Sequence, residues 1–326
     1  MIIRPCRVRL SRLVPAVALL AAVGSTWLAP GAASAQSEPR GAGDEAAVAS
    51  VQAPTRLHSE PNVYGLVTLP GDFVTVRYSA GHLDRAARLQ ARLEPALRVI
   101  RDWAGVDDLE VTTYLLSRED WERARIAMPY GVPVRVGRTA LAAPALGDDG
   151  TVGLWADLGI GLPSAQETPL RGTPQQAQSM VLADVLALLQ QSEIVVDRAI
   201  LAGDSFWSRA LVTHIALESY LTRYQPDTAR DLDLVWRQID GLRPLDTFST
   251  ADYRSEMGLL DWLWFQARYQ EGARLVVADE GRGAVRRVRK IAKRNGGGLT
   301  GALLFDEYAV LEPWFDRTFS AVSMRR

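Results

Sequence analysis

The sequence predicts an α+β protein in which a small mixed-sheet lobe precedes a mostly helical lobe. Two observations lead to this prediction. Runs of alternating β-branched and aromatic residues, such as 73–78 (FVTVRY), fall in the first half of the chain. After Pro163, apolar residues recur at helical spacing instead, and the expected helices follow one another to the end of the chain. A segment of strands and helices followed by helices alone is typical of this fold class.

The N-terminal residues 1–35 have the order of a secretory signal peptide. Four arginines and no acidic residue precede an apolar stretch, Leu13–Trp27, and the small residues Ala33-Ser34-Ala35 predict cleavage after Ala35. The apolar stretch is shorter than the roughly 20 residues that span a bilayer, so a retained N-terminal anchor is the alternative. We therefore expect an exported protein, either periplasmic or extracellular.

The composition after cleavage excludes several classes of protein. Cys6 is the only cysteine and lies in the leader, so a disulfide-stapled secreted domain is excluded. Cleavage removes four of the 37 basic residues and none of the 38 acidic ones, which leaves a net charge of −5, and nothing indicates nucleic-acid binding. Residues 36–57 are rich in alanine, glycine, serine, proline and charge, which predicts a disordered linker.

Residues 58–163 are predicted to form the sheet lobe, with strands at 73–78, 109–116, 136–143 and 151–158. The last two strands are expected to pair as a hairpin across the turn 147–150, which reads Gly-Asp-Asp-Gly. A helix that ends at Gly105 contains Pro95, which is expected to kink it or divide it into two. A shorter helix follows Ser117, a residue type favoured at the N-cap.

Residues 164–326 are predicted to form the helical lobe. Thr173-Pro174 is a start signal, because proline is favoured at the first helical position. The expected helices are 174–191, 205–224, 228–240, 249–271, 272–280, 283–294, 300–308 and 311–319. The first two of these helices follow the sheet lobe directly, and we expect a site to be built at this junction.

This order of elements resembles the gluzincin zinc metallopeptidases, in particular the peptidase-MA-like proteins. The resemblance covers about residues 70–320 and includes the segments 180–189 (MVLADVLALL) and 206–211 (FWSRAL). It implies that 58–326 is one unit with a thermolysin-like fold. In that family a helix bearing His-Glu-x-x-His holds zinc and activates a water molecule, and the next helix adds a carboxylate ligand.

The resemblance places the two zinc histidines at Ala183 and Ala187, the general base at Asp184 and the third zinc ligand at Ala210. Alanine offers no lone pair to a metal, so no zinc site can form at these positions and no cofactor is expected. A shift of the alignment by one turn changes nothing, because the first junction helix contains no histidine. The sequence therefore favours a degenerate family member that is not an enzyme.

Asp184 has two interpretations. It shares a helix face with Ala177, Val181 and Leu188, and a carboxylate on an apolar face is costly unless it is paired. It is either the remnant of a catalytic acid or a structural carboxylate that binds an arginine or a neighbouring helix end. The apolar surroundings favour the structural role.

His214 and Glu218 are spaced i, i+4 in the second junction helix, and this spacing can place both side chains on one metal ion. Two ligands do not make a metal site, and apolar residues surround the same helix face, so a core histidine is favoured. A hydrolase with a displaced site, which would use Asp184, Asp204 or Glu218 together with His214, is the alternative.

The stretch 286–294 is basic and amphipathic. Its cations are Arg286, Arg287, Arg289, Lys290, Lys293 and Arg294. Such a stretch is typical of a surface helix with a solvated charged face, and the alternative is a weak contact with a membrane surface.

Three functions follow from these patterns. The first is an exported pseudopeptidase that binds a peptide, an envelope polymer or a protein partner in the cleft between the lobes. The second is the hydrolase with a displaced site, and the third is a structural envelope protein that contacts anionic partners through its basic helix. A retained cleft would favour the first, acids gathered around His214 the second, and a filled cleft with a basic patch the third.

Overall fold

The computed structural model describes residues 61, 63–126, 128, 130–144, 174–200, 205–241, 251–253 and 258–319. All of them belong to one compact unit, Gln52–Arg326. The expected signal peptide 1–35, the linker 36–57, the strand 151–158 and Asp204 lie outside the described residues. Among the helices that the structure describes, none is both long and apolar enough to cross a membrane.

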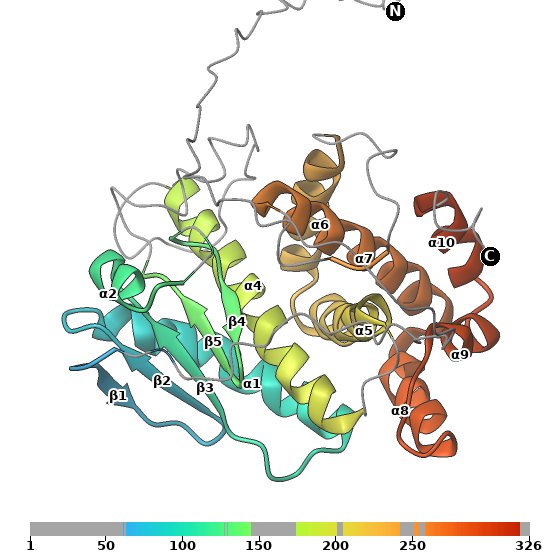
Figure 1. The fold of residues 1–326 in the computed structure, drawn as a ribbon, viewed down its shortest axis with the longest axis horizontal. Helices are drawn as coiled ribbons and strands as arrows, with labels where there is room; N and C mark the ends of the chain where they lie inside the picture. The colour runs from blue at the N-terminus through green and yellow to red at the C-terminus, as the bar shows by residue number, and fades with distance from the viewer. Residues whose placement is uncertain are drawn as a thin grey trace, which may run out of the picture. The chain divides into compact units, whose positions relative to one another are not determined.

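The described part of the sheet lobe forms a five-stranded mixed sheet (Figure 1). In sheet order its strands are β1 (Val67–Leu69), β2 (Val74–Tyr78), β3 (Val111–Leu115), β5 (Thr139–Ala142) and β4 (Val134–Val136). The three inner strands are parallel, and the edge strands β1 and β4 are antiparallel to their neighbours. The predicted fold class, a mixed sheet followed by helices, is confirmed.

Two helices belong to this sheet lobe. α1 (Leu83–Ala104) leads from β2 to β3 and ends, as predicted, at Gly105, whose φ of 68° is a left-handed conformation that favours glycine. Of the two alternatives expected at Pro95, division of the helix is wrong, because α1 is continuous through it. Pro95 is exposed, so water can bond the carbonyl that the missing N–H leaves unpaired. α2 (Arg118–Arg123) begins after Ser117, whose side chain accepts a hydrogen bond from a backbone N–H, as expected of an N-cap.

The strand expected at 136–143 is present in part, as β5, but it does not begin at Val136, since the chain makes a hairpin there. β4 ends at Val136 and β5 begins at Thr139, and these two residues pair with each other across the turn Gly137-Arg138. Gly137 has a φ of 58°, which glycine adopts at no steric cost.

Helices make up the described structure after the sheet. They are α4 (Pro174–Ala199), α5 (Phe206–Tyr224), α6 (Pro226–Gly241), α7 (Leu259–Glu280), the 3-10 turn η2 (Gly281–Gly283), α8 (Ala284–Arg294), α9 (Gly301–Glu307) and α10 (Leu311–Thr318). α4 starts at Pro174 as predicted but continues to Ala199. The break expected between 271 and 272 is absent, because Gly272 lies inside α7. Glycine serves there as packing space, since a Cβ at Gly272 would lie 2.8 Å from Cζ2 of Trp314.

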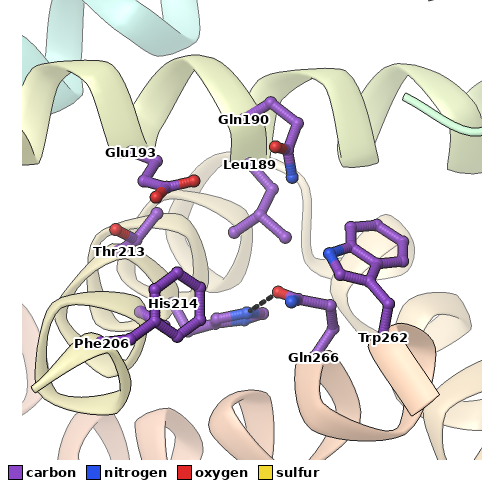
Figure 2. Close-up of a pocket in the computed structure, with 9 residues that line it drawn as sticks. Leu189, Gln190, Glu193, Phe206, Thr213, His214, Trp262 and Gln266 are labelled. Carbon is purple, nitrogen blue, oxygen red and sulfur yellow. Dashed lines mark hydrogen bonds between the residues drawn. The ribbon is translucent and has the colours of Figure 1, made fainter. Parts of the chain in front are cut away.

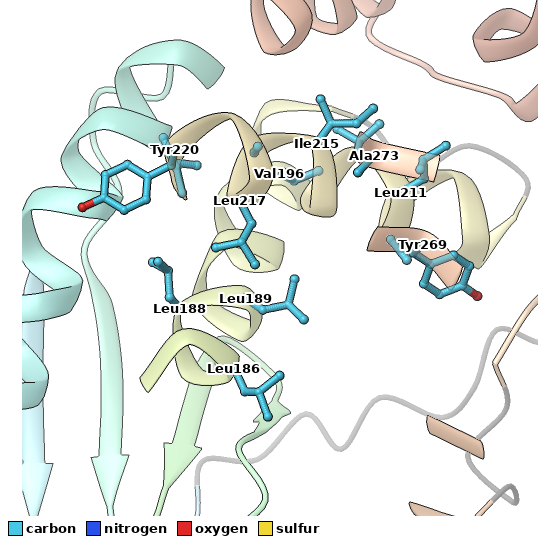
Figure 3. Close-up of a cluster of buried hydrophobic side chains, with 14 of the residues drawn as sticks. Leu186, Leu188, Leu189, Val196, Leu211, Ile215, Leu217, Tyr220, Tyr269 and Ala273 are labelled. Carbon is cyan, nitrogen blue, oxygen red and sulfur yellow. The ribbon is translucent and has the colours of Figure 1, made fainter. Parts of the chain in front are cut away.

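α4, α5 and α7 supply the centre of the hydrophobic core (Figure 3). Leu186 and Leu189 of α4, Leu211 and Leu217 of α5, and Tyr269 of α7 belong to one buried cluster. α4 also contacts α1 and β5, so it joins the sheet to the helical part of the chain. The two helices predicted to carry a site, α4 and α5, therefore meet where the sheet lobe and the helical lobe are joined.

Candidate functional site

A small cavity lies where α4, α5 and α7 meet (Figure 2). α4 lines it with Leu189, Gln190 and Glu193, α5 with Phe206, Ala210, Thr213 and His214, and α7 with Trp262 and Gln266. The volume of the cavity is about 30 Å³. Because one buried water molecule needs roughly 10–15 Å³ on the same measure, the cavity has room for about two waters and not for a peptide.

Two glutamines of α7 fix the ring of His214. Its Nδ1 lies 2.7 Å from Oε1 of Gln270. Its Nε2 lies 2.9 Å from Oε1 of Gln266, and Figure 2 shows this second contact. Gln270 donates a hydrogen bond from its amide nitrogen to Glu218, so its Oε1 is left to accept from Nδ1–H of His214. A neutral ring carries one proton, so Nδ1–H donates to Gln270, whereas a hydrogen bond from Nε2 to Oε1 of Gln266 requires the protonated ring.

Burial shifts the pKa values of the two titratable groups in this hydrogen-bonded series, His214 and Glu218. His214 is 1% exposed, and burial lowers its pKa below the ordinary 6.5, although the hydrogen bonds to Gln270 and Gln266 oppose the shift. Burial likewise raises the pKa of the Glu218 carboxyl, against the Thr222 hydrogen bond, the Arg274 charge and the Gln270 hydrogen bond. The imidazole is therefore neutral near pH 7, and it serves as a hydrogen-bonding link between α5 and α7.

Glu193, which also lines the cavity, belongs to a network of four charges. Arg135 of β4 lies 3.2 Å from Glu193 and 2.7 Å from Asp197, and Arg209 of α5 lies 3.3 Å from Asp197. Burial lowers the pKa of Arg135, but the neighbouring charges of Glu193 and Asp197 outweigh burial and raise it. The network ties the edge strand to both junction helices, so the carboxylate of Glu193 is held in structural ion pairs.

Asp184 lies in a different interface from His214. It forms ion pairs with Arg85 and Arg92 of α1, and Nε of Arg92 lies 3.2 Å from its Oδ2. Asp184 and Arg85 are both 3% exposed. The carboxylate thus has arginine partners that tie α4 to α1, whereas Glu218 reaches His214 through Gln270.

The alanines named by the resemblance lie in the packed interior. Ala183, Ala187 and Ala210 are all buried, and only Ala210 lines the cavity. The α4 residues that line the cavity, Leu189, Gln190 and Glu193, lie two, three and six residues after Ala187. Within the residues that the structure describes, no group of three or more histidine, cysteine, aspartate or glutamate side chains could hold a metal ion.

The sequence analysis missed Gln266, Gln270 and Arg135. Gln266 and Gln270 are spaced i, i+4 on α7, whose buried face is otherwise largely apolar. A polar pair on such a face needs a buried hydrogen-bonding partner, so this spacing is a usable signal. Arg135 gave no such signal, because its partners lie on α4, far along the chain.

The chain matches no protein-family model, no curated protein and no solved structure. Its function is therefore inferred from the cavity, the helices around it and the charged surface of the molecule.

Proposed function

We propose that the chain is an exported, non-catalytic protein on a gluzincin-type scaffold, which acts in binding or assembly in the cell envelope. The interface between α4 and α5 is the observation that carries this proposal. Of the three positions that the resemblance assigns to zinc ligands, only Ala210 faces the cavity of about 30 Å³, beside Leu189 and Gln190, whereas Ala183 and Ala187 are packed in the interior. A catalytic zinc site needs three protein ligands and an open fourth position for water or substrate.

The order of elements supports the thermolysin-like part of the proposal. Among the described residues, a β2–α1–β3 unit is followed by an antiparallel edge strand, β4, and by a further parallel strand, β5. Two long helices in mutual contact come next, α4 and α5. In the family that the sequence resembles, the helix pair after the sheet carries the metal ligands.

The residues around the cavity do not fit a catalytic zinc ion. Ala210 and Leu189 have no donor atom, and Gln190 offers only an amide. His214 and Glu193 have suitable donors, but Gln266 lies against Nε2 of His214, and Arg135 pairs with Glu193. A metal bound there would leave Arg135 without one of its two carboxylate partners in a largely buried position, which is costly. We therefore derive no catalytic step through zinc.

Zinc content of the purified protein, measured by elemental analysis, tests the proposal. We expect far less than one zinc per chain, and no rise in the melting temperature when zinc is added. A metal that binds the folded protein at 100 times its dissociation constant would instead add about 2.7 kcal/mol to the free energy of unfolding. One zinc per chain that is lost in His214→Gln and kept in the control His82→Gln would refute the proposal and move the site to His214.

A hydrolase with a displaced site is the second candidate. The hydrogen bonds that link Glu218 to Gln270 and Gln270 to His214 favour this candidate. They end at a neutral histidine that lines a cavity with room for water. A neutral imidazole could act as a general base toward a water in this cavity only if Gln266 moved away from Nε2. If this candidate is correct, the wild type cleaves a fluorogenic peptide or ester, and folded His214→Gln does not. Absence of cleavage by the wild type would exclude hydrolysis of those substrates.

A further inference from the structure

α8 places apolar side chains and cations on different sides of one helix. Val285, Val288 and Ile291 are buried in the main core cluster. The same eleven-residue helix carries six cations and no acidic residue. Since the apolar side is already packed against the protein, α8 cannot insert that side into a bilayer as an interfacial amphipathic helix does.

Three of the six cations have partners within the protein. Arg287 pairs with Glu280 and, at 2.6 Å, with Glu307, and Arg294 lies 3.4 Å from Glu307. The guanidinium of Arg289 lies against Gly105, where α1 ends. A cation is favoured there, because the C-terminus of a helix carries a partial negative charge. These three side chains hold α8 in place.

The other three cations, Arg286, Lys290 and Lys293, point to solvent. All three are exposed, and they are spaced i, i+4, i+7, which places them in one stripe along the outer side of the helix. No acidic side chain among the described residues forms an ion pair with them. The stripe is therefore a row of three exposed cations, which no described acidic side chain pairs with, on a protein whose net charge is −1 for the full sequence and −5 after the expected cleavage.

We propose that this stripe, Arg286, Lys290 and Lys293, docks the protein on an anionic lipid surface. The charges stand on the outer side of a helix and do not line the α4–α5–α7 cavity, so they suit a flat, diffuse array of negative charge. Cations near an anionic leaflet each contribute to binding through its surface potential. The contact is electrostatic and reversible, since the apolar side of α8 remains in the core. This lipid contact uses a surface outside the α4–α5–α7 cavity and therefore goes beyond the proposed function.

Sedimentation of the purified protein with lipid vesicles tests the inference. The vesicles contain equal parts of phosphatidylglycerol and phosphatidylcholine, and vesicles of phosphatidylcholine alone serve as the neutral surface. We expect binding to the anionic vesicles only, and its loss at high salt, because the screening length falls from about 30 Å at 0.01 M to about 3 Å at 1 M. At about 1 kcal/mol per cation, each charge removed lowers the partition constant about fivefold, so Arg286→Gln/Lys290→Gln/Lys293→Gln lowers it about 100-fold.

The matched control is Arg88→Gln/Arg125→Gln/Arg138→Gln, which removes three exposed arginines outside α8. Both triple variants make the same change in net charge, so the control separates a local stripe from overall charge. Equal loss in the two variants, unchanged binding in the stripe variant, or binding to neutral vesicles would each overturn the inference. Vesicle binding uses neither zinc nor a hydrolase substrate, so its outcome is independent of the test of the proposed function.

Discussion

Replacing Asp184 by asparagine removes the carboxylate that holds two arginines of α1 against α4. The shape of the side chain is kept, and the packing of the neighbouring leucines is not changed. Arg85 and Arg92 then face an amide, which can accept a hydrogen bond but cannot balance their charges. The substitution therefore isolates the electrostatic part of the α1–α4 contact.

The two arginines differ in how easily their side chains can reach water once the carboxylate is removed. The side chain of Arg92 is 15% exposed and can turn toward water, whereas that of Arg85 is 4% exposed and is held among buried residues of α1. Removing one partner of a buried ion pair costs about 3–5 kcal/mol, because the other charge is left uncompensated. Because only Arg85 would be left buried without a carboxylate partner, we expect the free energy of unfolding to fall by about 3–4 kcal/mol. At about 2–4 °C per kcal/mol for a domain of this size, the melting temperature falls by roughly 10 °C.

Chemical denaturation of Asp184→Asn and of the wild type, followed by circular dichroism, measures this loss. The control is Asp227→Asn, because Asp227 pairs with Arg230 at the surface and such pairs contribute about 1 kcal/mol or less. The double variant Arg85→Met/Asp184→Leu should recover much of the loss, since it removes both charges together. A single variant within 1 kcal/mol of the wild type would refute the account, and so would a double variant that is no more stable than the single one.

Two further predictions concern His214 and Gly272. Burial lowers the pKa of His214 below 6.5, so below pH 6.5 the unfolded chain binds a proton that the folded chain resists, and the free energy of unfolding falls as the pH falls. His214→Gln should remove this part of the pH dependence. Melting temperatures of the variant and the wild type, measured on either side of pH 6.5, will test this. The same dependence of melting temperature on pH in both proteins would contradict the prediction. Gly272→Ala should destabilise by about 1 kcal/mol, because the overpacking against Trp314, about 1–3 kcal/mol, exceeds the gain in helix propensity of about 1 kcal/mol. Gly283→Ala meets open space and should be neutral or stabilising, and a stabilised Gly272→Ala would show that the Trp314 ring yields.

Local signals predicted most of the fold. The end of α1 at Gly105, the N-cap at Ser117 and the start of α4 at Pro174 each depend on one residue type and its neighbours, and all three are present in the structure. The hairpin at Gly137-Arg138 was missed, because apolar residues on both sides continue the strand pattern across a turn of only two residues. The false break at Gly272 has a tertiary cause, since the glycine leaves space for Trp314, which lies outside any local window.

The candidate site was less predictable because its contacts are long-range. Helical spacing placed His214 and Glu218 on one face, but it could not show that Gln270, 52 residues beyond Glu218, would stand between them. The same spacing left two interpretations of Asp184 open, and the positions of Arg85 and Arg92 on another helix supply its partners. Periodicity identifies which face of a helix is buried, and it carries no information on which element covers that face.

The buried polar groups of α4 and α5 also explain how the junction helices are oriented. Apolar packing between two helices tolerates rotation and sliding, because leucine, isoleucine and valine can repack at little cost. A buried polar group tolerates neither, since moving it breaks its hydrogen bonds where few partners can replace them. α4 is held toward α1 by Asp184, and α5 is held toward α7 by His214. We infer that these two polar contacts fix the rotation of the helices, so that the junction keeps one geometry.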